Sequence, residues 1–255
     1  MSNKSLPNGL IKGTIIARIN WSEHLFSLQI KASISPFKAG QFIKLALQTE
    51  TGDWHRRAYS LVNSPNDALL EVLVVVVPNG ELSPRLNSLQ SGDNIYVGEH
   101  ASGFMTIDEI PNNALDLWML STGTAIGPFL SMLSDAQTLN RFGKLVLVHA
   151  VRYEKELVYQ DRIAVLQKQL GDRFHYVPIV SRETVNDALT GRIPDALASG
   201  ILQQRTKLQH NPLQSFFLIC GNPAMVRDTR KTLESLGYKK HLRRQPGQFT
   251  SENYW

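Results

Sequence analysis

The sequence predicts two domains of different class, an antiparallel β-barrel followed by a parallel-sheet α/β domain. Up to about position 100, most of the sequence consists of short strand-like segments rich in β-branched residues. Beyond that point, apolar strand-like segments alternate with helical ones, which is typical of a parallel sheet with crossover helices. The polar, proline-containing stretch Asp108–Asn113 separates the two patterns. We therefore expect domains over residues 8–108 and 114–255.

The strands of the predicted barrel are short, and the most apolar segment is Leu69–Val77, which stops at the turn sequence Pro78-Asn79-Gly80. Its β-branched residues and its short length favour a central strand over a helix. The remaining strands mix branched residues with an alternating pattern, and they are Ile15–Ile19, Leu25–Ile30, Gln41–Leu47 and Asn94–Val97.

The second domain is predicted from four apolar strands and three helical stretches. The strands are Leu115–Leu120, Lys144–Ala150, Phe174–Val180 and Ser215–Cys220, the last of the series. The helices are Gly127–Leu139, Asp161–Leu170 and Pro223–Leu236, and Gln245–Thr250 is predicted as a turn. Ligands of such sheets bind beyond the carboxyl ends of the strands, so the residues after each strand are the candidates for binding.

Composition excludes several classes of protein. The 255 residues are 42% hydrophobic and 19% charged, so the chain can bury a core. The net charge of +5 is too small and too dispersed to indicate nucleic-acid binding, but it favours acidic partners or phosphorylated ligands. A single cysteine, Cys220, excludes an internal disulfide and a cysteine-ligated cluster, and the seven histidines lack metal-ligand spacing. Without a membrane-length apolar stretch or a signal peptide, we expect no membrane association and a cytoplasmic location.

Two motifs of the barrel half suit a ligand with a pyrophosphate and a flat ring. Arg57 and Tyr59 of Arg57-Ala58-Tyr59-Ser60 lie on one face of a strand, where they offer a cationic fork and an aromatic surface. The alternative is an exposed arginine beside a half-buried tyrosine. Ser83 followed by Pro84 predicts a helix start with Ser83 as the cap, although most capped helices bind nothing.

The loops of the α/β half suit a nucleotide. Ser121–Pro128 lies between a strand and a helix and contains two glycines, although Ala125 replaces the middle glycine of the full dinucleotide fingerprint. The next strands end in basic residues instead of the acidic residue that holds the ribose of NAD, which favours NADP. These residues are Arg152, Ser181, Arg182 and Arg192, and the alternative is a set of solvated surface arginines. Cys220, before Gly221-Asn222-Pro223, is either a small core residue or a neighbour of a nicotinamide.

Taken in order, the motifs resemble those of the ferredoxin–NADP reductase superfamily, over roughly residues 10 to 255. The sequence is most similar to the bacterial flavodoxin/ferredoxin–NADP reductases. The shared motifs are Arg57–Ser60, Asn63–Pro65, Leu82–Leu86, Gly123–Pro128, Ser181–Thr184, Thr190–Pro194, Cys220–Pro223 and the aromatic ending Tyr254-Trp255.

The resemblance implies an FAD-binding barrel and an NADP-binding α/β domain. It implies that Arg57 pairs with the FAD pyrophosphate, that Tyr59 stacks on the isoalloxazine, and that Ser60 bonds near its reactive nitrogen. The implied FAD contacts are Arg57, Ala58, Tyr59, Ser60, Val74, Val75, Leu82, Ser83, Thr124, Tyr254 and Trp255. We expect the added terminal Trp255 to cover FAD at its adenine and Tyr254 to lie beside the ring system.

The implied NADP contacts are Thr122, Gly123, Arg152, Ser181, Arg182, Arg192 and Asn222. The residues implied at the reacting rings are Tyr59, Ser60 and Cys220, and no metal is expected. The expected activity is electron transfer between NADPH and a separate acidic ferredoxin or flavodoxin by a monomeric enzyme. A free-flavin or quinone reductase, a non-catalytic redox sensor and a nucleotide-binding protein without flavin remain the alternatives.

Overall fold

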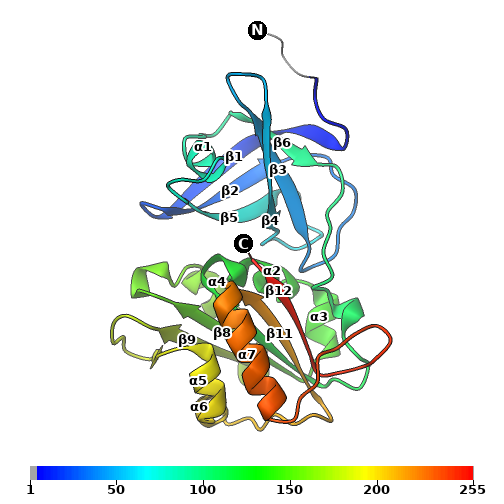
Figure 1. Ribbon diagram of the computed structural model, residues 1–255, viewed down its shortest axis with the longest axis vertical. Helices are drawn as coiled ribbons and strands as arrows, with labels where there is room; N and C mark the ends of the chain where they lie inside the picture. The colour runs from blue at the N-terminus through cyan, green and yellow to red at the C-terminus, as the bar shows by residue number, and fades with distance from the viewer. Residues whose placement is uncertain (1–4, 255) are drawn as a thin grey trace.

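The chain folds into two six-stranded sheets stacked along the long axis of the molecule (Figure 1). This computed structural model describes residues 5–254. The first sheet is antiparallel, the second is parallel and flanked by helices, and the predicted fold class is therefore confirmed. The domain limits 8–108 and 114–255 stay a prediction.

The antiparallel sheet has the strand order β4-β3-β6-β1-β2-β5. Branched and aromatic side chains fill its interior, and Ile15, Phe26 and Val72 are fully buried there. Its elements are β1 (Leu10–Ser22), β2 (Leu25–Lys31), β3 (Phe42–Gln48), β4 (Trp54–Ser60), β5 (Leu70–Val75), α1 (Ser83–Asn87) and β6 (Asn94–Gly98).

The parallel sheet has the order β10-β9-β8-β7-β11-β12, so the order reverses beside β7. Its strands are β7 (Asp116–Thr122), β8 (Lys144–Val151), β9 (Phe174–Val180), β10 (Leu189–Thr190), β11 (Ser215–Gly221) and β12 (Phe249–Asn253). The α-helices are α2 (Ile126–Met132), α3 (Ala136–Arg141), α4 (Gln160–Leu170), α5 (Ile193–Ala198), α6 (Ile201–Thr206) and α7 (Pro223–Ser235). Short 3₁₀ turns lie at Ile107–Glu109, Gly123–Ala125, Glu154–Glu156 and Gly171–Arg173. No helix within residues 5–254 is long and apolar enough to cross a membrane.

Three local expectations were wrong. The sheet does not end at β11, because β12 adds a further parallel strand beside it. The single helix predicted over Gly127–Leu139 is two helices, and Asp135 caps the second by accepting from the Thr138 amide. Ser83 does not cap α1: the N-cap is Leu82, and the Ser83 hydroxyl accepts from the Val77 amide instead, at 2.9 Å.

The two sheets share apolar contacts, because one buried cluster draws residues from both. Leu25, Val62 and Leu73 of the first half pack in the cluster that contains Phe129 and Leu147 of the second. In Figure 1, β12 runs toward the antiparallel sheet. Because β12 is parallel to the other strands of its sheet, the carboxyl edge of that sheet faces the junction.

Candidate active site

Strand β4 carries Arg57, Tyr59 and Ser60, and its last residue, Ser60, lies at the junction between the sheets. The Arg57 guanidinium is exposed and donates to the Glu81 carboxylate at 3.0 Å. Tyr59 is half-buried, and burial raises its pKa to about 12, so its phenol is neutral near pH 7. The strand therefore presents a cation and a neutral aromatic ring two positions apart.

Ser60 and Tyr254 join the predicted flavin motif to the end of the chain. The Tyr254 side chain is hydrogen-bonded to Ser60, and its pKa is raised mainly by burial. The Tyr254 amide also donates to the Gly221 carbonyl at 3.0 Å, directly after β11. One residue thereby links β4 to the carboxyl end of the parallel sheet.

The other predicted FAD contacts surround this strand. Val74 is buried in the barrel core, whereas Val75 is half-buried and packs against the cluster shared by the two sheets. Leu82 and Ser83 are buried at the start of α1, next to Glu81. Ala58 is exposed on β4. Trp255 lies outside the described residues.

Thr122 ties the nucleotide loop to the end of β11. Its hydroxyl accepts from the Asn222 amide at 2.9 Å. Gly221, with φ of 142°, lies so close that a β-carbon there would be 2.0 Å from the Thr122 hydroxyl oxygen. The Asn222 side chain caps α7 by accepting from the Ala224 and Met225 amides. These contacts hold the loop after β7 against the loop after β11, the two loops that the sequence assigned to the nucleotide.

Gly123 begins the turn of that loop, and Thr124 follows it as a buried residue. Gly123 adopts φ of 56°, and a β-carbon at this position would meet no atom within 4 Å, so a ligand can approach the backbone there. Below the turn, the fully buried His149 ring has Nε2 at 3.0 Å from the Gly123 carbonyl oxygen.

Gly127, at the start of α2, permits the helix to approach β4. A β-carbon at this position would lie 3.2 Å from a Val62 methyl group and 4.0 Å from Ser60. The helix that follows the nucleotide loop therefore packs directly on the chain that follows the flavin motif.

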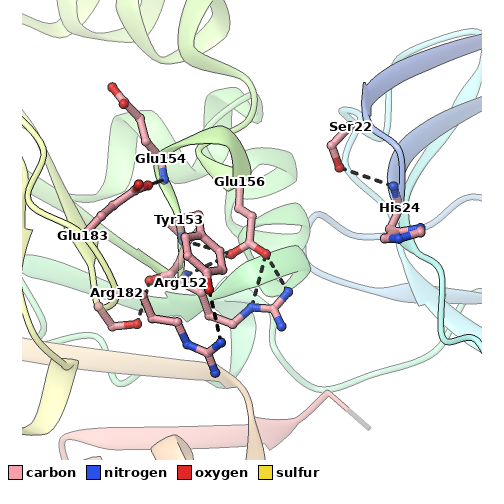
Figure 2. A network of polar contacts seen from close by, with 10 residues as sticks. Ser22, His24, Arg152, Tyr153, Glu154, Glu156, Arg182 and Glu183 are labelled. Carbon is pink, nitrogen blue, oxygen red and sulfur yellow. Dashed lines mark hydrogen bonds and ion pairs between the residues drawn. The ribbon is translucent and has the colours of Figure 1, made fainter.

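Two of the predicted phosphate-binding residues, Arg152 and Arg182, lie side by side after β8 and β9 (Figure 2). The Arg182 amide donates to the Arg152 carbonyl at 3.0 Å, which joins the two strand ends. The Arg152 guanidinium remains more than half exposed while it pairs with the Glu156 carboxylate at 2.6 Å. The Arg182 guanidinium lies over the Tyr153 ring, 5.7 Å from its centre.

Ser181 and Arg192 complete this exposed group. The Ser181 amide and hydroxyl both donate to the Val151 carbonyl, at 3.0 and 3.2 Å. Arg192 is exposed and is the N-cap of α5, two residues after β10, which pairs with β9. All four predicted residues thus follow neighbouring strands of one sheet edge.

Cys220 lies at the carboxyl end of β11, opposite Glu252 on β12. It is 1% exposed, and burial followed by the nearby Glu252 charge raises its pKa, so it is a neutral thiol. Burial also raises the pKa of Glu252, whose carboxylate accepts from the Phe104 amide. The structure therefore gives no reactive thiolate at this position, and within the described residues no group of three potential metal ligands occurs.

Sequence reasoning missed several residues of this region. Glu156 accepts from both the backbone and the guanidinium of Arg152, and its position four residues after Arg152 was the available signal. His149 and Tyr159 gave no local signal, because their partners are distant in the sequence.

Comparisons with known proteins agree with this arrangement. The family model described as "Oxidoreductase FAD-binding domain" matches residues 13–99, and that of the "Oxidoreductase NAD-binding domain" matches residues 119–231. A flavodoxin/ferredoxin–NADP reductase of Escherichia coli is 47% identical over 96% of this chain and 98% of its own length. The chain belongs to the flavodoxin/ferredoxin–NADP reductase family. Another member of this family, from Buchnera aphidicola, is 43% identical over 97% of this chain and 100% of its own length.

Solved structures extend the family comparison to cofactors. A ferredoxin NADP+ reductase from Neisseria gonorrhoeae, with bound FAD and NADP, superposes with a TM-score of 0.92 at 34% identity. The match covers 98% of this chain and 100% of that one. The residues of this family member fit both FAD and NADP. Arg57 lies beside an aromatic ring, as FAD requires, and exposed arginines together with a loop that is open at Gly123 suit NADP.

Proposed function

We propose that this protein transfers electrons between NADPH and a separate one-electron carrier, a ferredoxin or a flavodoxin, with FAD as its cofactor. The hydrogen bond between Ser60 and Tyr254 carries the proposal, because it joins the predicted flavin strand to the carboxyl edge of the nucleotide domain. Family membership supports the same activity. When bound, FAD supplies hydride chemistry with nicotinamide and single-electron exchange with a carrier.

The residues of the chain hold and align the two cofactors in this proposal. Arg57 binds the FAD pyrophosphate and releases part of its contact with Glu81 to do so. Tyr59 stacks on the flavin, while Ser60 donates near its reactive nitrogen. Tyr254 lies beside the ring system where nicotinamide enters, and the neutral Cys220 provides a small apolar contact to nicotinamide.

The remaining FAD contacts proposed are Ala58, Val74, Val75, Leu82, Ser83, Thr124 and Trp255. Thr122, Gly123 and Asn222 contact the nicotinamide half of the nucleotide. Arg152, Ser181, Arg182 and Arg192 bind the adenosine 2′-phosphate, and their shared exposure at one sheet edge supports this assignment. We assign the two cofactors to domains 8–108 and 114–255.

An acidic carrier docks, in this proposal, on the basic segment before β12. Arg243 and Arg244 are exposed there, and Arg243 pairs with Glu109 at 2.8 Å while its guanidinium stays 69% exposed. The Arg243 guanidinium also lies 4.8 Å from the centre of the exposed Phe104 ring. The net charge of +5 is complementary to an acidic protein. We further propose a monomer in the cytoplasm, a compartment that suits the free thiol of Cys220.

The decisive experiment measures the two half-reactions separately on the purified protein. A yellow protein that NADPH bleaches within the turnover time, under anaerobic conditions, supports the enzyme over a sensor or a nucleotide-binding protein without flavin. Turnover that depends on added ferredoxin or flavodoxin, and not on free flavin or quinone, supports a protein carrier. Faster turnover with free flavin or quinone than with either carrier would contradict the proposal.

A further inference from the structure

Tyr159 lies buried between the two domains in a backbone conformation that residues with a side chain rarely adopt. Its φ is 62° and its ψ is 27°, and only 6% of the residue is exposed. It precedes α4, so the strained residue fixes where that helix begins. Such strain persists where surrounding contacts outweigh it.

The Tyr159 hydroxyl makes two hydrogen bonds, both to the antiparallel sheet. It donates to the Glu71 carboxylate of β5 at 2.7 Å and lies 2.7 Å from the Ser27 hydroxyl of β2. Because the phenol has one hydrogen and gives it to Glu71, Ser27 is the donor of the second bond. Ser27 in turn accepts from the Trp21 indole at 2.8 Å.

The result is a directed chain of donors across the domain boundary, from Trp21 through Ser27 and Tyr159 to Glu71. The Trp21 and Tyr159 rings also pack together, with centres 4.7 Å apart. Burial and the Glu71 charge raise the pKa of Tyr159, so the phenol stays a neutral donor at any physiological pH. We call these four residues the interdomain latch.

The latch lies next to backbone that leads to both predicted cofactor sites. The Glu71 carbonyl accepts from the Val62 amide, two residues beyond Ser60. On the other side, Ser131 of α2 donates to the Asn63 carbonyl at 2.6 Å, and Arg162 of α4 donates to the Val62 carbonyl at 3.0 Å. The helix that follows the nucleotide loop is thereby bonded to the chain that follows the flavin motif.

We propose that Tyr159 is a positioning residue that fixes the nucleotide domain against the flavin domain, so that nicotinamide and flavin meet in a reactive alignment. This inference rests on the proposed function. Alignment of the reacting atoms governs the rate of transfer more steeply than it governs binding, because small displacements already remove productive geometry. None of the four latch residues is a proposed contact of the FAD pyrophosphate or of the NADP 2′-phosphate, so loss of the latch should leave nucleotide affinity nearly unchanged.

The test compares Tyr159→Phe with Tyr176→Phe in the FAD-loaded protein. Tyr176 is a half-buried tyrosine of the nucleotide domain, and among the described residues its hydroxyl bonds within that domain, accepting from the Gln160 amide group at 3.0 Å. Anaerobic stopped-flow at several NADPH concentrations gives the Kd and the limiting rate of flavin reduction. We expect Tyr159→Phe to lower the limiting rate roughly tenfold or more with a Kd within about twofold, and Tyr176→Phe to change neither.

Amide hydrogen exchange supplies a readout that does not depend on activity. Tyr159→Phe should speed exchange in segments 59–63 and 126–134, on both sides of the boundary, whereas Tyr176→Phe should not. Glu71→Ala, which removes the acceptor from the other domain, should reproduce both effects, and Glu71→Gln, which keeps an acceptor, should largely restore the parental values. If Tyr159→Phe does not fold, Glu71→Ala decides.

Parental hydrogen exchange and a parental limiting rate in both Tyr159→Phe and Glu71→Ala would overturn the proposal. Equal effects of Tyr159→Phe and Tyr176→Phe would overturn it as well. Failure of the proposed function is distinguishable, because the unmodified protein would then not be reduced by NADPH, while the exchange measurement would still decide whether the latch holds the domains.

Discussion

The buried ring of His149 supports the carbonyl group of Gly123, with 3.0 Å between Nε2 and the oxygen. A carbonyl oxygen only accepts, so Nε2 carries the hydrogen, and Nδ1 is left buried without a partner. This tautomer holds the first residue of the nucleotide loop at the end of β7. Burial lowers the pKa of His149 from 6.5 to about 4, which outweighs the opposing effects of the Gly123 bond and Glu156.

His149 should therefore make the fold sensitive to acid. Its pKa is lower in the folded than in the unfolded chain, so its contribution is intact above pH 6.5 and is lost as the pH falls toward 4. The shift in pKa corresponds to a loss of about 3 kcal/mol of folding stability once the pH is below both pKa values. His149→Gln keeps an N–H for Gly123 and should flatten the decline of Tm between pH 6.5 and 4.5. The exposed His24→Gln is the control, and an unchanged profile for His149→Gln would contradict the assignment.

Arg182→Ala should weaken NADPH binding while leaving NADH binding nearly unchanged. Loss of one charged hydrogen-bonding partner of the 2′-phosphate costs about 1.5–3 kcal/mol, or roughly ten- to a hundredfold in Kd. Titration of flavin reduction with each nucleotide measures both affinities. Arg173→Ala is a matched control, because its guanidinium bonds to the Leu139 and Phe142 carbonyls at the opposite end of the sheet. Equal losses for NADPH and NADH would remove the phosphate assignment.

Carrier reduction should slow as salt rises, whereas flavin reduction by NADPH should change little. Only the reduction of the carrier is expected to depend on long-range attraction to an acidic protein. Arg244→Gln should lower the slope of the carrier step against ionic strength, and Lys12→Gln, which removes the same charge from exposed Lys12 on β1, should not. A carrier step that is independent of salt would point to a mainly apolar contact.

The sequence was informative where a predicted site depends on a local motif. Arg57–Ser60 and the loop after β7 were predicted because each is contiguous and lies beside a recognisable strand. Strand β12 was missed because Phe249–Asn253 is mostly polar and follows Pro246-Gly247, and its partner β11 lies some thirty positions earlier. Pairing at such a distance is decided by tertiary packing, as shown by the complete burial of Phe249.

Interdomain contacts were beyond the reach of sequence reasoning for the same physical reason. Tyr159 stands before a helical pattern and is an ordinary aromatic residue in the sequence. Its left-handed backbone and its bond to Glu71, 88 positions away, arise only when the two domains pack. Glu156 is the intermediate case, since its spacing of four residues from Arg152 is a local signal that sequence reasoning did not use, whereas its bonds to backbone amides leave no signal in the sequence.

Gly221→Ala should destabilise the protein by more than the backbone conformation of Gly221 alone accounts for, and it should weaken NADPH binding. Gly221 and Gly237 both have φ in the region that favours glycine, 142° and 88°. A β-carbon at Gly237 meets nothing within 4 Å, so Gly237→Ala carries only the conformational cost of about 1 kcal/mol.

At Gly221 the same atom would lie 2.0 Å from the Thr122 hydroxyl oxygen and 3.0 Å from the Thr122 amide nitrogen, so one of the two loops must move. The overlap adds about 1–3 kcal/mol, and the displaced Thr122 loses its bond from the Asn222 amide. Thermal unfolding should show the larger Tm loss for Gly221→Ala, and NADPH titration should show weaker binding for that variant alone. Equal Tm losses with parental NADPH binding in both variants would mean that the Thr122–Gly221 contact does not shape the nucleotide site.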